Sequence, residues 1–158
     1  FESEHLLGCA AGEASGVQPQ AQTFENGLML RVEDSWLGPE PYLFAFIWDE
    51  ERQEYGFTEG PLLDSWTADM AEQVVGEEPP QGLLRPSRGF GLLWSGQIEL
   101  PGMGESRTMD GLNLLGWANE PVQAYDAQYQ CAEELFGNQN CYLSLPDGQV
   151  VGLPGRTH

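Results

Sequence analysis

Apolar residues fall in short runs separated by polar, turn-forming residues, a pattern that indicates strands more than helices. The run 42–48 (Tyr-Leu-Phe-Ala-Phe-Ile-Trp) predicts a buried strand. The polar residues 49–52 predict a turn after it, and residues 53–58 then return as the partner strand. We therefore expect an antiparallel hairpin over this part of the chain.

Two further turns are predicted from specific residue types. Asn26-Gly27, within the apolar stretch 24–32, occupies the place of a tight hairpin turn. Pro146-Asp147-Gly148 predicts a turn because Pro presets φ and Gly accepts positive φ. Residues 149–153 then complete a second hairpin with the strand-like segment that begins at Cys141.

The middle of the chain, about residues 59–113, reads differently because it is rich in Pro and Gly. Residues 65–75 are compatible with a short helix whose N-cap would be Ser65, and Leu92-Leu93-Trp94 predicts another short buried piece. A long span with little regular structure is unusual inside a compact domain and is often functional. We expect this span to wrap the β core or to reach a neighbouring molecule.

A short motif occurs twice. Leu6-Leu7-Gly8-Cys9-Ala10 recurs as Leu114-Leu115-Gly116-Trp117-Ala118, and a polar stretch and then an apolar strand follow each copy. The shared order predicts a degenerate internal duplication, with units at about 5–58 and 112–153 joined by an irregular connector, 59–111. The expected fold is one mainly β domain over residues 1–158, a compact antiparallel β domain with short helices and long Pro/Gly-rich loops.

Charge narrows the range of partners. The chain has 25 acidic and 6 basic residues, a net charge of −19, and all six basic residues are Arg. Such a field repels phosphate backbones and anionic lipids, so we expect neither nucleic acid nor a membrane surface as partner. No apolar run approaches a bilayer-spanning length, so membrane insertion is not expected either. The acidic residues otherwise read as a solvated coat that would attract cations.

The cysteines and the first residue suggest secretion. Cys131 and Cys141 flank the turn formers 137–140, a spacing that suits a disulfide, although two buried thiols would also fit. Cys9 is then left over, and Leu6-Leu7-Gly8-Cys9 spells a lipidation signal that lacks the apolar stretch such signals need. The start at Phe1 predicts a removed signal peptide, and hence an extracellular protein at the cell surface.

The residues that usually carry catalysis are sparse. The two histidines, His5 and His158, lie at the chain ends, which leaves no natural base for a nucleophile, so we expect no enzyme. We expect no cofactor. Calcium is conceivable at Asp49-Glu50-Glu51 or near Asp147, without an EF-hand pattern to support it.

Aromatic residues are the better candidates for a binding surface. Trp36 and Trp66 lie in polar, loop-like contexts that favour exposure, and Trp94 and Phe90 are further candidates for an interface or for a ligand. The alternative for each is a place in the core.

Two motifs resemble a known family. Leu7-Gly8-Cys9-Ala10 followed by Phe24-Glu25-Asn26-Gly27 resembles the LGFP-type repeat of secreted bacterial cell-surface proteins, and 86–94 leading to Leu115-Gly116-Trp117-Ala118 looks like an uncharacterised LGWA-type relative. The resemblance implies an extracellular, non-catalytic role. We expect a self-assembling subunit of a surface filament, tube or layer, hence a homo-oligomer or polymer. The alternative is a monomeric module that binds cell-wall polysaccharide or another carbohydrate.

Overall fold

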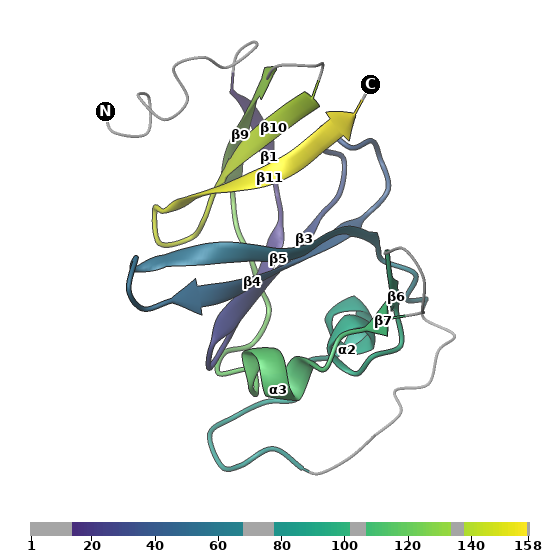
Figure 1. Ribbon diagram of the computed structural model, residues 1–158, viewed down its shortest axis with the longest axis vertical. Coiled ribbons are helices and arrows are strands. Elements are labelled where there is room, and N and C mark those ends of the chain that lie inside the picture. The colour runs from purple at the N-terminus through teal and green to yellow at the C-terminus, as the bar shows by residue number, and fades with distance from the viewer. Residues whose placement is uncertain (1–13, 68–77, 102–106, 134–137, 158) are drawn as a thin grey trace.

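The computed structural model describes residues 14–67, 78–101, 107–133 and 138–157, and there the protein is mainly β, with two larger antiparallel sheets, one small two-stranded sheet and two short helices (Figure 1). The five-stranded sheet has the order β5-β4-β3-β2-β8, and the four-stranded sheet has the order β1-β9-β10-β11. The strands are β1 (Ser15–Val17), β2 (Gln20–Phe24), β3 (Gly27–Val32), β4 (Tyr42–Asp49), β5 (Glu54–Leu63), β8 (Gln123–Ala124), β9 (Ala127–Glu133), β10 (Asn138–Ser144) and β11 (Val150–Thr157).

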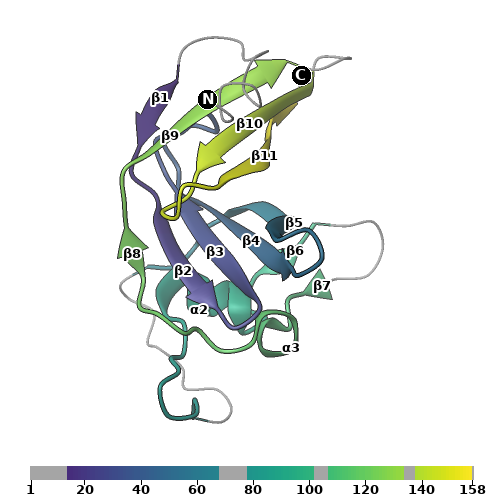
Figure 2. The same ribbon diagram turned by 90° about the vertical axis from the view of Figure 1, so that its left-hand side faces the viewer.

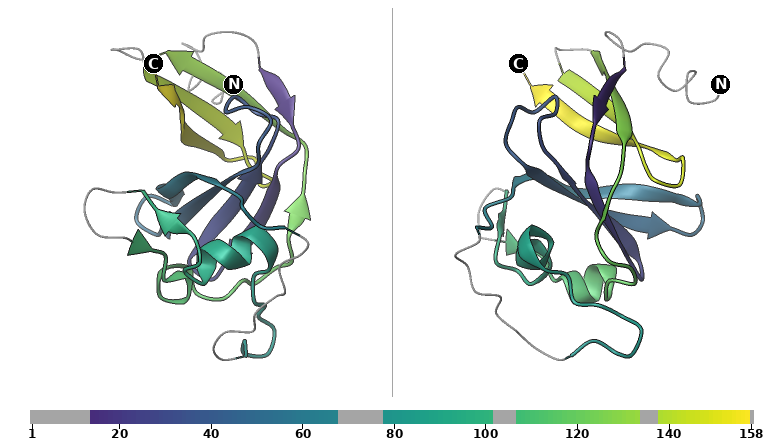
Figure 3. Two further views of the ribbon diagram at one scale, coloured as in Figure 1. Left: turned by 90° about the vertical axis from the view of Figure 1, so that its right-hand side faces the viewer. Right: turned by 180° about the vertical axis from the view of Figure 1, so that it is seen from behind.

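The five-stranded sheet is the middle layer of the molecule, with the four-stranded sheet over one face and helices over the other (Figures 1 and 3). Alternate residues of β4 enter the two different cores: Phe44 and Phe46 face the other sheet, while Leu43 and Ala45 face the helices. Because both faces of β4 are covered, its sequence is apolar throughout and does not alternate. This confirms the buried strand predicted over residues 42–48.

The intersheet core fills the space between the two sheets. Its central side chains, such as Leu30 and Phe44, are fully buried, and it closes around residues of β10 and β11. The buried members are Val17, Ala21, Leu28, Leu30, Val32, Trp36, Phe44, Phe46, Ala127, Cys141, Leu143, Leu145, Val151 and Leu153.

The helix-side core lies on the opposite face of the five-stranded sheet. There α2 (Arg88–Trp94) and α3 (Gly111–Leu115) pack against β3 and β4, as Figure 3 shows. Asp110 caps α3, because its carboxylate accepts a hydrogen bond from the Asn113 amide at 3.2 Å. The buried members of this core are Phe24, Met29, Leu43, Ala45, Leu62, Phe90, Leu93, Trp94, Leu100, Met109, Leu115, Trp117 and Ala118.

The Pro/Gly-rich middle of the chain contains regular structure and contributes to a core. Residues 59–111, expected to be an irregular connector, contain the end of β5, helix α2 and the two-stranded sheet of β6 (Glu99–Leu100) and β7 (Arg107–Thr108). The buried piece predicted at Leu92-Leu93-Trp94 is part of α2. The apolar face of α2 packs on the five-stranded sheet, so this part of the middle segment wraps the β core, which was one of the two expectations. The helix predicted over residues 65–75 lies mostly outside the described residues.

The predicted hairpins are confirmed with small shifts. β4 and β5 pair around a turn at residues 50–53, and β10 and β11 pair around Pro146-Asp147-Gly148, where Gly148 has a positive φ of 91°. The first tight turn is one residue earlier than expected, at Glu25-Asn26, and Gly27 begins β3. Gly27 is needed for close approach, because a Cβ there would collide with the Phe46 carbonyl and the Leu115 side chain.

The expected duplication stays a prediction. The first copy of its motif, Leu6–Ala10, lies outside the described residues, and the second spans the end of α3 and the chain after it. The two apolar segments that follow the motifs are β4 and β10. Each is an inner strand of its sheet and each continues into a hairpin.

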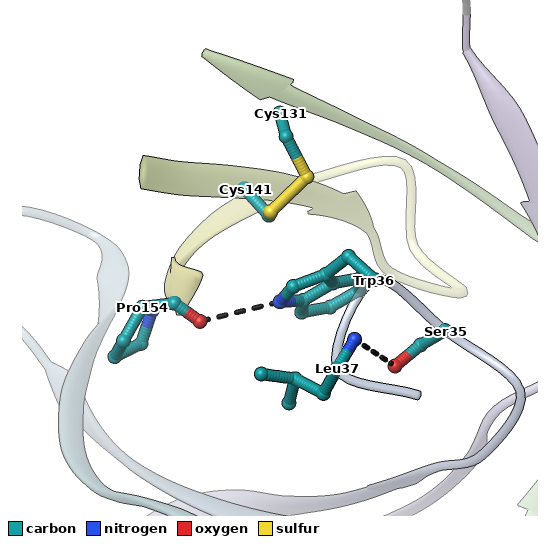
Figure 4. The surroundings of a disulfide bond; sticks show 6 residues. All are labelled: Ser35, Trp36, Leu37, Cys131, Cys141 and Pro154. Atoms are coloured by element: carbon teal, nitrogen blue, oxygen red, sulfur yellow. Dashed lines mark hydrogen bonds between the residues drawn. A yellow bond between two sulfur atoms is a disulfide. The ribbon is translucent and has the colours of Figure 1, made fainter. Parts of the chain in front are cut away.

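Cys131 and Cys141 form a disulfide, as predicted. They lie directly opposite each other on β9 and β10, with their Cα atoms 3.9 Å apart. The bond therefore ties two neighbouring strands at the edge of the intersheet core, and Trp36 lies close to it (Figure 4). Disulfides persist in oxidising compartments, so the bond fits such a location.

Candidate functional site

A pocket of about 570 Å³ lies on the helix side of the five-stranded sheet. This volume is within the range of about 300–1,000 Å³ that is typical of small-molecule sites. The strands supply one wall, and the chain before and within α2 supplies another. The lining residues are Gln20, Gln22, Arg31, Asp64, Trp66, Leu84, Arg85, Ser87, Arg88, Gly89, Phe90, Pro121 and Val122.

Sequence alternation explains why the pocket forms here. Gln20 and Gln22 point to the same face of β2 as Phe24, which belongs to the helix-side core, and Gln20 pairs with Arg31 on β3. This corner of the sheet therefore presents polar side chains where the rest of the face is apolar. Figure 2 shows β2 beside the edge strand β8, with α2 against the sheet. The pocket lies between these polar side chains of β2 and β3 and the segment that contains α2.

Asp64 organises the floor of the pocket. Its carboxylate accepts a hydrogen bond from Arg31 Nε at 2.8 Å and another from the Trp66 amide at 3.0 Å, and its side chain is only 6% exposed. A Cβ at Gly89 would collide with this carboxylate, so the helix backbone packs directly against it. Because both carboxylate oxygens accept bonds from fixed donors, Asp64 holds Arg31 and Trp66 in place.

Arg88 and Trp66 form the exposed part of the site. The Arg88 guanidinium carbon lies 5.3 Å from the Trp66 ring centroid, within the range of a cation–π contact. Arg88 also adopts a positive φ of 55°, which a non-glycine residue rarely does. Strained backbone of this kind clusters at ligand sites. Arg85 lies over Trp117, with 5.8 Å between its guanidinium carbon and the ring centroid.

Gln22 is the buried polar residue of the pocket wall. It is 4% exposed, and its amide nitrogen donates to the Glu120 carbonyl at 3.0 Å. A carbonyl accepts only from the NH₂ group, so this bond fixes which end of the amide points which way. Gln22 Oε1 is left without a hydrogen-bond partner among the described residues. A buried acceptor in this condition costs about 1–3 kcal/mol.

The electrostatics of the pocket oppose those of the whole chain. Three of the six arginines line it, together with one acidic residue, Asp64, whereas the chain as a whole has a net charge of −19. A basic pocket on an acidic molecule is not expected from composition. It favours ligands with an anionic or electron-rich group.

Two of the four aromatic candidates line this pocket, and two do not. Trp66 is half-buried and Phe90 is buried at its inner wall. Trp94 belongs to the helix-side core, where its indole N–H donates to the Gly116 carbonyl at 2.9 Å. Trp94 is thus a core residue, 7% exposed.

The expected exposure of Trp36 is wrong. The side chain is 9% exposed and packs in the intersheet core, 4.9 Å from the Tyr129 ring between centroids. Its indole N–H donates to the Pro154 carbonyl at 3.2 Å, as Figure 4 shows. The polar sequence around Trp36 reflects a loop, but the loop folds the Trp36 side chain inward because that buries the ring and pairs its N–H.

The carboxylates considered for calcium stabilise turns. Asp49 Oδ1 accepts from the amides of Glu51 and Arg52, and Asp147 Oδ1 accepts from the Gln149 amide at 2.9 Å. Glu50 lies in the same turn as Glu51, which the Asp49 cap holds. Within the described part of the chain no three His, Cys, Asp or Glu side chains gather as a metal site would require.

Comparisons with protein families, with curated proteins and with solved structures found no match for this chain. The resemblance to LGFP-type repeats therefore stays a prediction. Within the described residues no helix is long and apolar enough to cross a membrane. The description of the protein therefore rests on its own fold and pocket. Two larger antiparallel sheets pack together, helices cover the other face of the five-stranded sheet, and the arginine-rich pocket lies on that helix side.

Sequence reasoning missed the polar residues of the site. Arg85 and Arg88 could have been recognised as a candidate basic site, because two of only six basic residues fall within four positions of each other. Arg31 and Gln22 could not have been recognised, since their places depend on strand register and on contacts with residues far away in the chain.

Proposed function

We propose that the protein is a non-catalytic, extracellular binding module that holds a carbohydrate, such as a cell-wall polysaccharide, in the pocket around Trp66. The observation that carries this proposal is the half-buried Trp66 indole, which lines one cavity together with polar side chains such as Gln20 and Arg88. Sugar rings present an apolar C–H face that packs on aromatic rings, and hydroxyl groups that hydrogen-bond to polar side chains.

The residues of the pocket favour binding over hydrolysis. Glycoside hydrolysis ordinarily uses two carboxyl groups, one on each side of the scissile bond. The lining holds one, Asp64, and its oxygens already accept from Arg31 and from the Trp66 amide. A carboxylate so engaged is suited to positioning its neighbours, which supports a non-catalytic role.

Retention on insoluble polysaccharide tests the proposal. Wild-type protein should be retained on a cell-wall polysaccharide panel, and Trp66→Ala should lower the affinity about tenfold or more, the scale expected for a central aromatic contact. Phe57→Ala is the matched control, because Phe57 is an aromatic residue 43% exposed on β5, outside the pocket lining. Equal retention of the Trp66 and Phe57 variants would exclude the pocket as the site.

Self-assembly into a surface filament or layer is a second candidate function, and one observation favours it. β5 is an edge strand of the described sheet and exposes Phe57 and Leu63, the latter at 53%. Exposed apolar edges pair with other copies. The same strand contains Pro61 and two register irregularities against β4, features that protect edges from pairing. These features make assembly the weaker candidate.

Sedimentation from about pH 3 to 8 tests assembly. Near the sequence pI of about 4.1 the net charge vanishes, so copies that pair through β5 should associate there and dissociate at neutral pH. Phe57→Glu should then prevent association. A monomer at every pH would exclude this candidate while leaving the binding proposal intact.

A further inference from the structure

The charge of the pocket narrows the class of carbohydrate, and this inference rests on the proposed function. A neutral sugar would use Trp66 but would leave the concentration of arginines unexplained. Three of six arginines line one cavity of a chain whose net charge is −19. Arginine recognises carboxylate and phosphate groups through a planar fork of donors.

Arg31 and Arg88 have different roles. Arg31 is already paired, with Asp64 at 2.8 Å and with Glu33 at 3.5 Å, so its charge is compensated within the protein. Arg88 has no acidic partner among the described residues, and its side chain is exposed at the mouth of the pocket. Of these two arginines, an incoming anion therefore gains more at Arg88.

Trp66 holds the Arg88 guanidinium in a defined place. The Arg88 guanidinium carbon lies 5.3 Å from the ring centroid, a cation–π contact that engages a face of the ring and leaves the N–H donors of the guanidinium for an anion. The Trp66 amide is in turn held by Asp64 at 3.0 Å, so the platform is anchored to the floor of the pocket. A fixed fork of this kind loses less conformational entropy on binding than a mobile side chain does.

We propose that the pocket binds saccharides that carry a carboxylate, of the uronic acid type, with the carboxylate on the Arg88 guanidinium and a ring face against the Trp66 indole. A sugar acid holds an anionic group and an apolar ring face together on one ring. A single negative charge on each sugar also limits the repulsion from the acidic surface around the pocket.

Calorimetric titration with a galacturonic acid trisaccharide and with its fully methyl-esterified form tests this proposal. The two probes share every hydroxyl and ring face and differ in the carboxylate charge. The acid should bind at least about tenfold more tightly than the ester, because charge-assisted bonds to arginine are about twice as strong as neutral ones. Raising the salt concentration should weaken binding of the acid and leave binding of the ester unchanged.

Three variants assign the interaction to residues. Arg88→Gln should remove the preference for the acid over the ester, and Arg88→Lys should restore part of it, since lysine keeps the charge without the fork. Arg52→Gln is the matched control, because Arg52 is an exposed arginine, 76% accessible, in the β4–β5 turn. A thermal unfolding curve of each variant verifies that it folds.

The outcomes separate this inference from the function on which it rests. Equal affinity for the acid and the ester, or a preference that survives Arg88→Gln, would overturn the carboxylate assignment while the carbohydrate-binding function stands. Tighter binding of inorganic phosphate or of a glycerol phosphate oligomer than of the acid would also overturn it. Failure of every saccharide to bind, neutral or acidic, would overturn the proposed function itself.

Discussion

The two faces of the five-stranded sheet are covered in different ways. On one face the intersheet core is built from strands, closed by a disulfide between β9 and β10. On the other face the helix-side core is built from the Pro/Gly-rich segment and two short helices. The first cover is apolar throughout, whereas the second leaves a polar corner, and the pocket lies in that corner. Under the proposed function, the strand side stabilises the molecule and the helix side binds the ligand.

The largest expected effect is on the strand side. Phe44→Ala removes a fully buried ring from the intersheet core, next to Trp36. The free energy of unfolding should fall by about 3–5 kcal/mol, because the cavity cannot be filled by neighbours on both sheets. Urea denaturation measures this loss. A decrease below about 1 kcal/mol would contradict the dominant role of this core.

A matched change on the helix side should be smaller in stability and larger in function. Leu93→Ala truncates a fully buried residue of α2, at a cost of about 2–4 kcal/mol. Because α2 also carries Phe90 and Gly89 of the pocket, this variant should lose ligand affinity while still folded. The folded fraction of Phe44→Ala should bind normally. Normal binding by Leu93→Ala would refute this division between the two faces.

Removing the disulfide should have an intermediate effect. Replacing Cys131 and Cys141 with Ala should lower the free energy of unfolding by about 2–3 kcal/mol, mainly because the unfolded chain gains freedom over a short loop. Pocket affinity should not change, since neither cysteine lines the pocket. Comparison of denaturation midpoints, with a binding titration in parallel, measures both quantities.

The smallest expected effect is an alkaline loss of stability on the strand side. Burial, and secondarily the Asp147 charge, raise the pKa of Tyr125, whose hydroxyl donates to the Ser144 carbonyl at 3.0 Å. Burial and the same carboxylate raise the pKa of Tyr55. The folded state therefore keeps protons that the unfolded state releases above about pH 10, so stability is complete below that pH and falls as pH rises beyond it.

Tyr125→Phe isolates this contribution. The variant lacks the ionisable group, so its free energy of unfolding should fall less than that of the wild type between about pH 8 and pH 11. Denaturation curves at the two pH values suffice. An equal fall in both proteins would show that Tyr125 does not contribute to the alkaline loss.

The sequence predicted the strand side better than the helix side, for physical reasons. Local patterns define hairpins, so the run at residues 42–48 and the turn at Pro146-Asp147-Gly148 were enough to place β4, β5, β10 and β11. Trp36 was misjudged because its burial depends on the Pro154 carbonyl, 118 residues away. No local pattern contains such a contact.

The candidate site could be predicted only in part. Trp66 and Phe90 were recognisable as ligand-binding candidates by residue type, yet nothing in the sequence placed them in one cavity. Their meeting depends on Asp64, which packs on Gly89 and holds Trp66 across the end of β5. The Gln22 acceptor is visible only once strand register and burial are known.

The most direct test of the binding site is a nuclear magnetic resonance titration that follows the five tryptophan indole N–H signals while the galacturonic acid trisaccharide is added. The Trp66 signal should shift with saturation behaviour. The Trp36 and Trp94 signals should stay in place, because their N–H groups remain bonded to the Pro154 and Gly116 carbonyls. A Trp66 signal that does not move at saturating concentrations of the acid and of its methyl ester would contradict the central claim.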